Sequence, residues 1–151
     1  MTHTVHPFAH RLGVIRDWKS RWFASNPKQY RENVMIDTTI RTFLKKRLRG
    51  MYVTSVEIER SRQAIRILLK TSRPGLVIGR GGEGSQKLQK EIAAQMRKVK
   101  GAPQLPVKLD IEEVRSPESQ APVVAYMVAE GLEKRQTFRR VLKQTIEKVM
   151  A

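Results

Sequence analysis

Three glycine patterns overlap in one stretch of the chain, and each is typical of a loop that handles phosphate. The stretch reads LVIGRGGEGSQKLQK and covers residues 76–90. Gly79, Gly81 and Gly84 match the G-x-G-x-x-G fingerprint of dinucleotide binding, in which the glycines let a pyrophosphate approach the backbone. Gly79 and Gly84 also have the outer spacing of a Walker loop. Residues 79–82 match a G-x-x-G clamp, past which a nucleic-acid backbone can run.

Two of these patterns lack the residues that would complete them. A Walker loop needs a lysine and then a serine or threonine after its last glycine, and Ser85-Gln86 stand there instead. A dinucleotide site needs a buried strand before the glycines and an acidic residue about 20 positions later. Pro74-Gly75 leaves three residues for that strand, and the segment 97–106 has no carboxylate. An NAD-dependent enzyme is therefore the least favoured reading, and we expect no cofactor and no small-molecule substrate.

The G-x-x-G pattern agrees best with its surroundings and is characteristic of KH RNA-binding domains. Without Cβ atoms at the turn, a sugar-phosphate strand can come close to the backbone. The free N–H groups at the start of the following helix would face its phosphates, and Arg80 adds a cation. A glycine-rich surface turn without a ligand is the alternative. The predicted RNA-binding residues are Gly79, Arg80, Gly81 and Gly82.

The charge of the chain favours the same class of partner. Thirty lysines and arginines stand against 14 acidic residues, which gives a net charge of +16. The excess is spread along the chain, with +8 in residues 1–50, +6 in 51–115 and +2 in 116–151. Such a surface repels itself unless a polyanion neutralises it. No apolar run approaches the roughly 20 residues of a membrane span, so nucleic acid is the favoured partner over a membrane.

The elements that would position the clamp follow from hydrophobic periodicity and from capping residues. Asp37 is the predicted N-cap of the first helix, and Leu76, Val77 and Ile78 are the predicted buried side of the short helix before the clamp. The expected elements are a helix over 37–49, a hairpin over 54–70, helices over 76–78 and 83–98, a strand over 107–114, and helices over 120–134 and from 137 onward.

The order helix, strand, strand, helix, helix, strand predicts an α+β fold, the type II arrangement of a KH domain. We expect an irregular basic arm over residues 1–33, the KH domain over 34–115, and the helical start of a second α/β domain over 116–151. Trp18 and Trp22 stand among cations in the arm, where stacking on RNA bases and packing against the core are equally plausible.

The arm supplies the residues expected to anchor the chain in RNA or on protein neighbours. They are His6, Arg11, Arg16, Trp18, Lys19, Arg21 and Trp22. The histidines at positions 3, 6 and 10 make a poor metal site, because Pro7 interrupts the helix that would align them and no cysteine is present. We therefore expect no metal.

Three segments together resemble the bacterial or organellar small-ribosomal-subunit protein S-three family, and the resemblance covers essentially all 151 residues. The segments are VHPFAHRLGVIRDWKSRWFA, RPGLVIGRGGE and FRRVLK. The resemblance implies a structural constituent of the small-subunit head, not an enzyme, that binds small-subunit (16S-type) rRNA and contacts mRNA near its entrance channel. The implied neighbours are the ribosomal proteins S-ten and S-fourteen. The implied location is the cytoplasm, within the ribosome, with an organellar ribosome left open.

In that family, basic residues on the last of these segments contact incoming message, which implies the same for Arg139, Arg140 and Lys143. Taken alone, the triplet reads as a solvated helix face. The chain departs from the family at its start, at Gly84-Ser85 after the clamp, and at Ala151, where it stops before strands that the family carries. We interpret it as truncated or only partly represented. A free-standing KH regulator of single-stranded RNA or DNA remains the second hypothesis.

Overall fold

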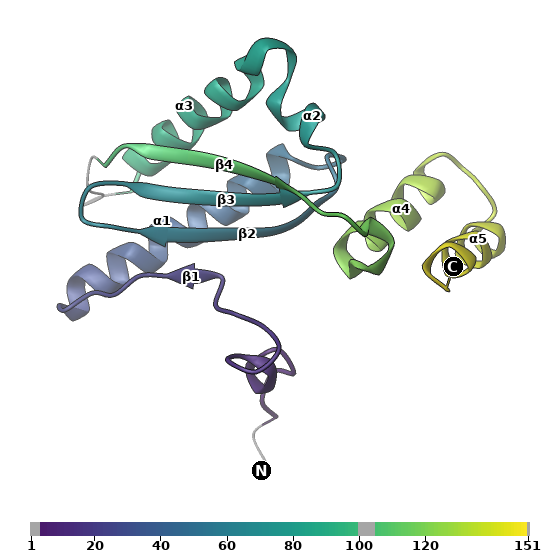
Figure 1. Cartoon of the computed structure of the whole chain (residues 1–151), viewed down its shortest axis with the longest axis horizontal. Helices are drawn as coiled ribbons and strands as arrows, with labels where there is room; N and C mark the ends of the chain where they lie inside the picture. The colour runs from purple at the N-terminus through teal and green to yellow at the C-terminus, as the bar shows by residue number, and fades with distance from the viewer. Residues whose placement is uncertain (1–3, 100–104, 151) are drawn as a thin grey trace.

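The computed structural model describes residues 4–99 and 105–150, and it has the predicted α+β order of elements. Figure 1 shows a sheet with helices behind it, an arm at the N-terminus and two helices at the C-terminus. The elements are the 3-10 turn η1 (Ala9–Arg11), β1 (Ser20–Arg21), α1 (Pro27–Arg47), β2 (Val53–Arg60), β3 (Ile65–Thr71), α2 (Pro74–Ile78), the turn η2 (Arg80–Gly82), α3 (Glu83–Arg97), β4 (Val107–Glu113), the turn η3 (Pro117–Ser119), α4 (Ala121–Glu133) and α5 (Phe138–Met150).

The sheet has the order β1-β2-β3-β4. Strands β2 and β3 form an antiparallel hairpin, as predicted. Strand β4 runs parallel to β3, so the chain must cross over between them, and α2 and α3 make that crossover. The two-residue strand β1 adds the arm to the outer edge of β2. The predicted type II order of elements is confirmed.

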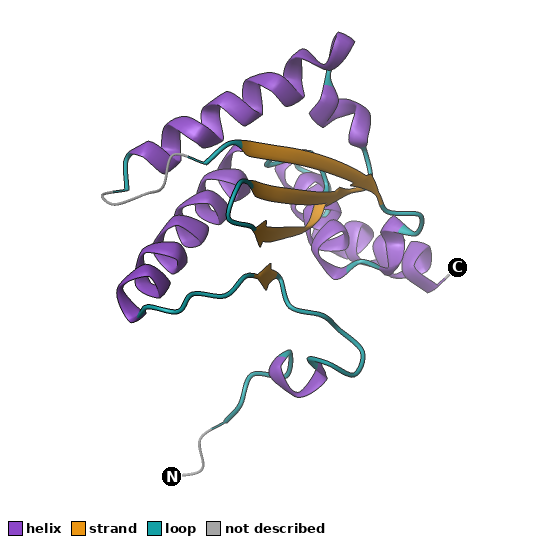
Figure 2. Cartoon of the chain, turned by 60° about the vertical axis from the view of Figure 1, so that its left-hand side comes forward, coloured by secondary structure: helices purple, strands orange, loops and turns teal. Residues whose placement is uncertain are grey.

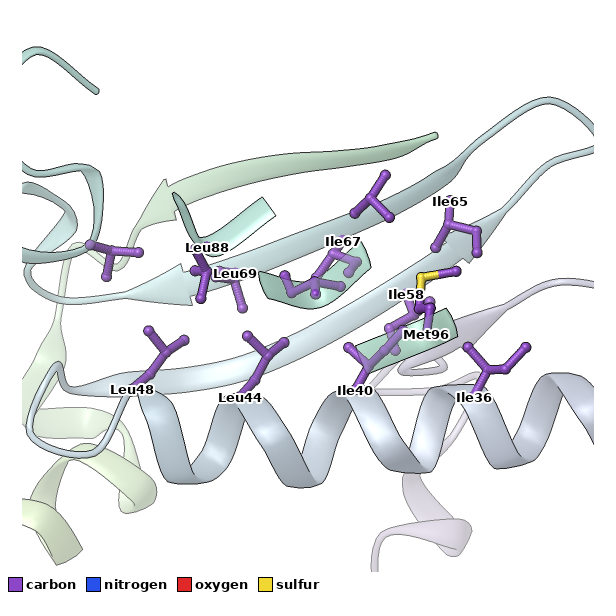
Figure 3. Packing of buried hydrophobic residues seen from close by; sticks show 13 residues of the cluster. Ile36, Ile40, Leu44, Leu48, Ile58, Ile65, Ile67, Leu69, Leu88 and Met96 are labelled. Atoms are coloured by element: carbon purple, nitrogen blue, oxygen red, sulfur yellow. The ribbon is translucent and has the colours of Figure 1, made fainter. Parts of the chain in front are cut away.

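The hydrophobic core lies between the sheet and the helices α1 and α3. Alternate residues of β3 are fully buried, as the period of two in the sequence predicts. Ile36, Ile40 and Leu44 of α1 face them, followed by Leu48 at the C-cap. Helix α3 contributes Leu88, Ile92 and Met96, as predicted. Figure 3 shows these side chains meeting in one cluster.

Helix α1 begins ten residues earlier than its predicted start. Pro27 occupies the first turn, and the side chain of Asn26 accepts a hydrogen bond from the Lys28 N–H, so Asn26 is the N-cap. The prediction that Asp37 caps this helix is wrong. The one residue buried in the first two turns of α1 is Asn33, which is polar, so these turns have no apolar period that would predict a helix. The last residues of the predicted irregular arm are therefore helical.

The short helix α2 buries less than predicted. Val77 is buried, but Leu76 is 54% exposed and Ile78 is 38% exposed. The prediction that all three face the core is correct for Val77 and wrong for the other two. A helix of five residues makes little more than one turn, so a single side chain can point at the sheet.

Helices α4 and α5 confirm the two helical patterns predicted after the KH segment. They cross closely, because a Cβ on Gly131 of α4 would lie 2.8 Å from a methyl carbon of Val141 on α5. Figures 1 and 2 place both helices apart from α3, whereas Tyr126 of α4 lines a pocket with Leu44 and Lys45 near the end of α1. Across residues 4–99 and 105–150, none of the helices combines the length and the apolar character that a bilayer span requires.

Candidate nucleic-acid interface

The clamp loop, defined as residues 79–82, joins the end of α2 to the start of α3. Gly79, Gly81 and Gly82 have φ angles of 71°, 60° and 82°, a region that side chains rarely adopt. The four predicted residues are therefore brought together in a turn whose backbone requires glycine. The same geometry argues against dinucleotide binding, since residues 74–78 form a helix and not the strand that this fingerprint requires.

The outer side of the clamp loop is open. A Cβ added to Gly81 would meet no atom within 4 Å, and one on Gly82 would meet only the Ser85 hydroxyl at 3.9 Å. No side chain caps the start of α3, because the Ser85 hydroxyl donates to the Gly82 carbonyl instead. The Glu83 N–H donates to the Arg80 carbonyl oxygen, and the Arg80 side chain is exposed beside the start of α3. A phosphate can thus reach a helix N-terminus and a cation together.

Gly84 also shapes the clamp loop, a role that was not predicted from the sequence. It lies in the first turn of α3, where a Cβ would stand 2.7 Å from the Val77 carbonyl oxygen and 2.8 Å from that of Ile78. The absence of a side chain lets α2 and α3 approach each other closely. A glycine in a helical turn that would favour alanine is the feature that could have indicated this contact.

Ser20 and Trp22 of the arm are fixed by a buried ion pair, which we call the arm latch. Asp37, 5% exposed, accepts a hydrogen bond from Arg60 at 2.8 Å. It also accepts from the Trp22 indole N–H at 2.8 Å and from the Ser20 hydroxyl at 3.1 Å. The Trp22 ring lies against Tyr30, with centroids 5.3 Å apart. Of the two roles left open for Trp22, the structure therefore supports packing.

Arg41 extends the arm latch toward β2. Its guanidinium donates to the Ser20 hydroxyl and to the Lys19 carbonyl oxygen, each at 2.8 Å, and to the Val56 carbonyl oxygen at 2.6 Å. Burial lowers the pKa of Arg41, while the carboxylates of Asp37 and Glu57 act in the opposite direction. The backbone of the arm is thus held to α1 and to the sheet.

The part of the arm before Ser20 is more open. Trp18 is 61% exposed, and the Phe8 ring carries Arg16 and Lys19 over it at 5.6 Å and 4.8 Å. Arg11 donates to the Pro7 carbonyl oxygen. His6 and His10 are exposed, His3 lies outside the described residues, and the described residues hold no cluster of metal-binding groups.

Three cations on the open face of the sheet are paired with carboxylates. Arg21 bonds Glu57 and Glu59, each at 2.9 Å, Lys70 bonds Glu57 at 2.8 Å, and Arg66 bonds Asp110. The hydrogen bond to Asp110 is also the main reason that the pKa of Arg66 is raised. Because these charges cancel locally, the open face is a poorer site for a polyanion than the clamp loop.

The basic triplet on α5 is accessible. Arg139, Arg140 and Lys143 are all exposed, and none of them has an acidic partner among the described residues. Arg139 lies over the Phe138 ring at 5.8 Å. On a helix, positions 139 and 143 share one row while 140 lies on the next, so the triplet covers two adjoining rows. The triplet and the clamp loop are on separate elements.

Comparison with known proteins gives two results. A family model described as KH domain matches residues 39–119. Over 150 residues, which is 99% of the chain, it is 39% identical to the small ribosomal subunit protein uS3 of Clostridium novyi, 40% to that of Caldicellulosiruptor bescii and 41% to that of Clostridioides difficile. The chain spans 65%, 64% and 53% of these relatives. The predicted resemblance to the S-three family is confirmed.

Proposed function

Because the chain belongs to the KH-domain family, we propose that it binds RNA as a structural constituent of the small ribosomal subunit and catalyses no reaction. The observation that carries the proposal is the clamp loop, where Gly81, Gly82 and Arg80 leave an open, cationic approach to the start of α3. The net charge of +16 supplies the wider attraction to phosphate.

The finer assignments rest on the similarity to uS3 proteins. We propose that small-subunit (16S-type) rRNA is the main partner, that the ribosomal proteins S-ten and S-fourteen are neighbours, and that the chain works in the cytoplasm. For Arg139, Arg140 and Lys143 we propose contact with mRNA near its entrance channel, which their exposure on α5 permits. The domain boundaries at residues 34 and 116 stay predictions.

Sedimentation separates a ribosomal role from that of a free-standing KH regulator. The tagged chain, produced in a bacterium, is expected to travel with small subunits through a sucrose gradient at modest salt. It should be released as salt rises, because distributed phosphate contacts weaken steeply with ionic strength. A chain that stays at the top of the gradient at low salt is not ribosomal, and the regulator then becomes the better hypothesis.

The clamp loop is tested by Arg80→Asp combined with Gly81→Asp. Two carboxylates in the phosphate path should weaken binding of single-stranded RNA by roughly tenfold or more, which corresponds to about 1.4 kcal/mol. Aspartate at position 81 adds backbone strain, but it is one of the few side chains that adopt this left-handed conformation and the space there is open, so the fold should persist. Fluorescence anisotropy with a labelled RNA measures the affinity, and circular dichroism checks the fold.

The matched control is Arg62→Asp with Gln63→Asp. These residues are exposed in the turn between β2 and β3, and the pair makes the same change in charge. Figure 1 shows that turn at the opposite end of the sheet from α2. Equal losses of affinity in the two variants would mean that the clamp loop makes no contact of its own.

A further inference from the structure

A groove with a volume of about 450 Å³ lies between the start of α2 and the helices α4 and α5. Three cations line it: Arg73, Lys134 and Lys148. Glu130 is the one carboxylate among its described lining residues. The side chains of Gln136, Gln144 and Thr145 complete its polar wall. None of these cations belongs to the clamp loop or to the triplet on α5.

The carboxylate in the groove is already occupied. Glu130 accepts hydrogen bonds from the Lys134 ammonium at 2.6 Å and from the Tyr52 hydroxyl. These bonds lower the pKa of Glu130, so its charge is matched within the wall. Within the part of the chain that the structure describes, Arg73 and Lys148 have no ion-pair partner. The groove therefore has about two positive charges with no counter-charge of their own.

Arg73 is held in place although it is exposed. Its guanidinium carbon lies 4.4 Å from the centre of the Tyr52 ring, and its backbone N–H donates to the Thr71 hydroxyl. A guanidinium stacked by one face keeps its N–H edge free for a further acceptor. Phosphate oxygens are acceptors that this planar edge can bind in a bidentate way.

The groove also adjoins both of the regions already described. Arg73 directly precedes α2, and α2 is the only helix between it and the clamp loop. On α5, Gln144 and Lys148 line the groove, and Arg140 lies one turn earlier on the same helical row. A strand leaving the clamp loop past Arg73 would reach α5 on the side of Arg140.

We propose that this groove, which we call the phosphate groove, binds phosphate groups of an RNA backbone through Arg73 and Lys148. The inference rests on the proposed RNA-binding function and adds a second, sequence-independent contact beside the clamp loop. Contacts to phosphate position a strand without selecting its bases. The phosphate groove therefore contributes affinity and salt dependence but no sequence preference.

The test is the double variant Arg73→Gln with Lys148→Gln in the full chain, measured against two single-stranded RNAs of unrelated sequence. Each lost phosphate contact should reduce the slope of log affinity against log salt by about 0.7, so the pair should reduce it by about 1.4. Affinity should fall by the same factor for both RNAs.

The matched control is Lys46→Gln with Arg62→Gln, two exposed cations outside the groove. Lys148→Gln alone is measured as well, in case the double variant does not fold. Lys148 takes no part in the hydrogen bond between Tyr52 and Glu130, so this single variant should keep the fold and lose one phosphate contact.

A parallel titration with inorganic phosphate, followed by NMR at the side-chain amides of Gln136 and Gln144, distinguishes the source of the phosphate. Shifts with RNA that disappear in the double variant support the proposal. An unchanged salt slope in the double variant overturns the proposal. The role of the clamp loop is then decided separately, by the variant Arg80→Asp with Gly81→Asp. Shifts with inorganic phosphate in a chain that does not bind RNA overturn the RNA backbone as the ligand. Failure of RNA at both the clamp loop and the groove rejects the proposed function as well.

Discussion

Replacing Asp37 with asparagine is expected to lower the free energy of unfolding by about 3–5 kcal/mol, because Arg60 would stay buried with no carboxylate beside it. The side chains of this pair are 7% and 6% exposed, so water cannot take over the lost interaction. Asparagine keeps the shape of the side chain but replaces one of two accepting oxygens with an NH2 group, so the loss reports on the charge together with the hydrogen bonds to that oxygen. Urea denaturation measures it, and fluorescence in a Trp18→Phe background, where Trp22 is the remaining tryptophan, shows whether the arm latch has opened.

Asp110→Asn is the matched control for this prediction. Asp110 also pairs with an arginine, Arg66, but both side chains are well exposed, and such a pair contributes about 0–1 kcal/mol. In addition, Arg60→Met combined with Asp37→Asn should be less destabilising than the sum of the two single changes. If the Asp37 and Asp110 variants lose equal stability, the arm latch does not contribute to the fold in this way.

Replacing Gly84 with alanine is expected to lower the free energy of unfolding by about 1–3 kcal/mol, the usual cost of overpacking. Alanine favours a helix over glycine by about 1 kcal/mol, so propensity alone predicts a gain. We expect a loss of stability instead, because the new Cβ would stand less than 3.0 Å from two backbone carbonyl oxygens of α2. Separation of α2 from α3 should also widen the clamp loop and weaken RNA binding.

Gly75→Ala supplies the comparison for Gly84→Ala. It makes the same substitution in α2, and a Cβ there would meet nothing within 4 Å. We expect this variant to be as stable as the parent or slightly more stable. Thermal unfolding of both proteins under one condition gives the answer. If both glycines can be replaced without loss of stability, the close approach of the two helices is not needed.

The core and the hairpin could be predicted because their periods are local. The period of two in β3 and the spacing of four in α3 each decide which residues are buried. The first two turns of α1 could not be predicted in this way, since they bury no apolar residue. Asn26 followed by Pro27 is the N-cap signal that the structure reveals, and the prediction chose Asp37 because the apolar spacing begins after it.

The clamp loop was predictable from its glycines, whereas the arm latch and the phosphate groove were not. Asp37 and Arg60 are 23 positions apart and meet only when α1 packs beside β2. Tyr52 and Glu130 are 78 positions apart. In both pairs, the sequence around one residue has no pattern that predicts its contact with the other. Such contacts follow from tertiary packing and become visible only once the elements have been placed.

The crossover between β3 and β4 bears on the order in which the chain acquires its structure. The hairpin of β2 and β3 joins neighbouring residues and closes a short loop, so it should form early. Ile65 pairs with Val107, which emerges during synthesis only after α2 and α3. Until then the inner edge of β3 has unpaired backbone groups, the condition in which strands from two chains can join. The nascent protein is therefore most prone to aggregate between the synthesis of β3 and that of β4.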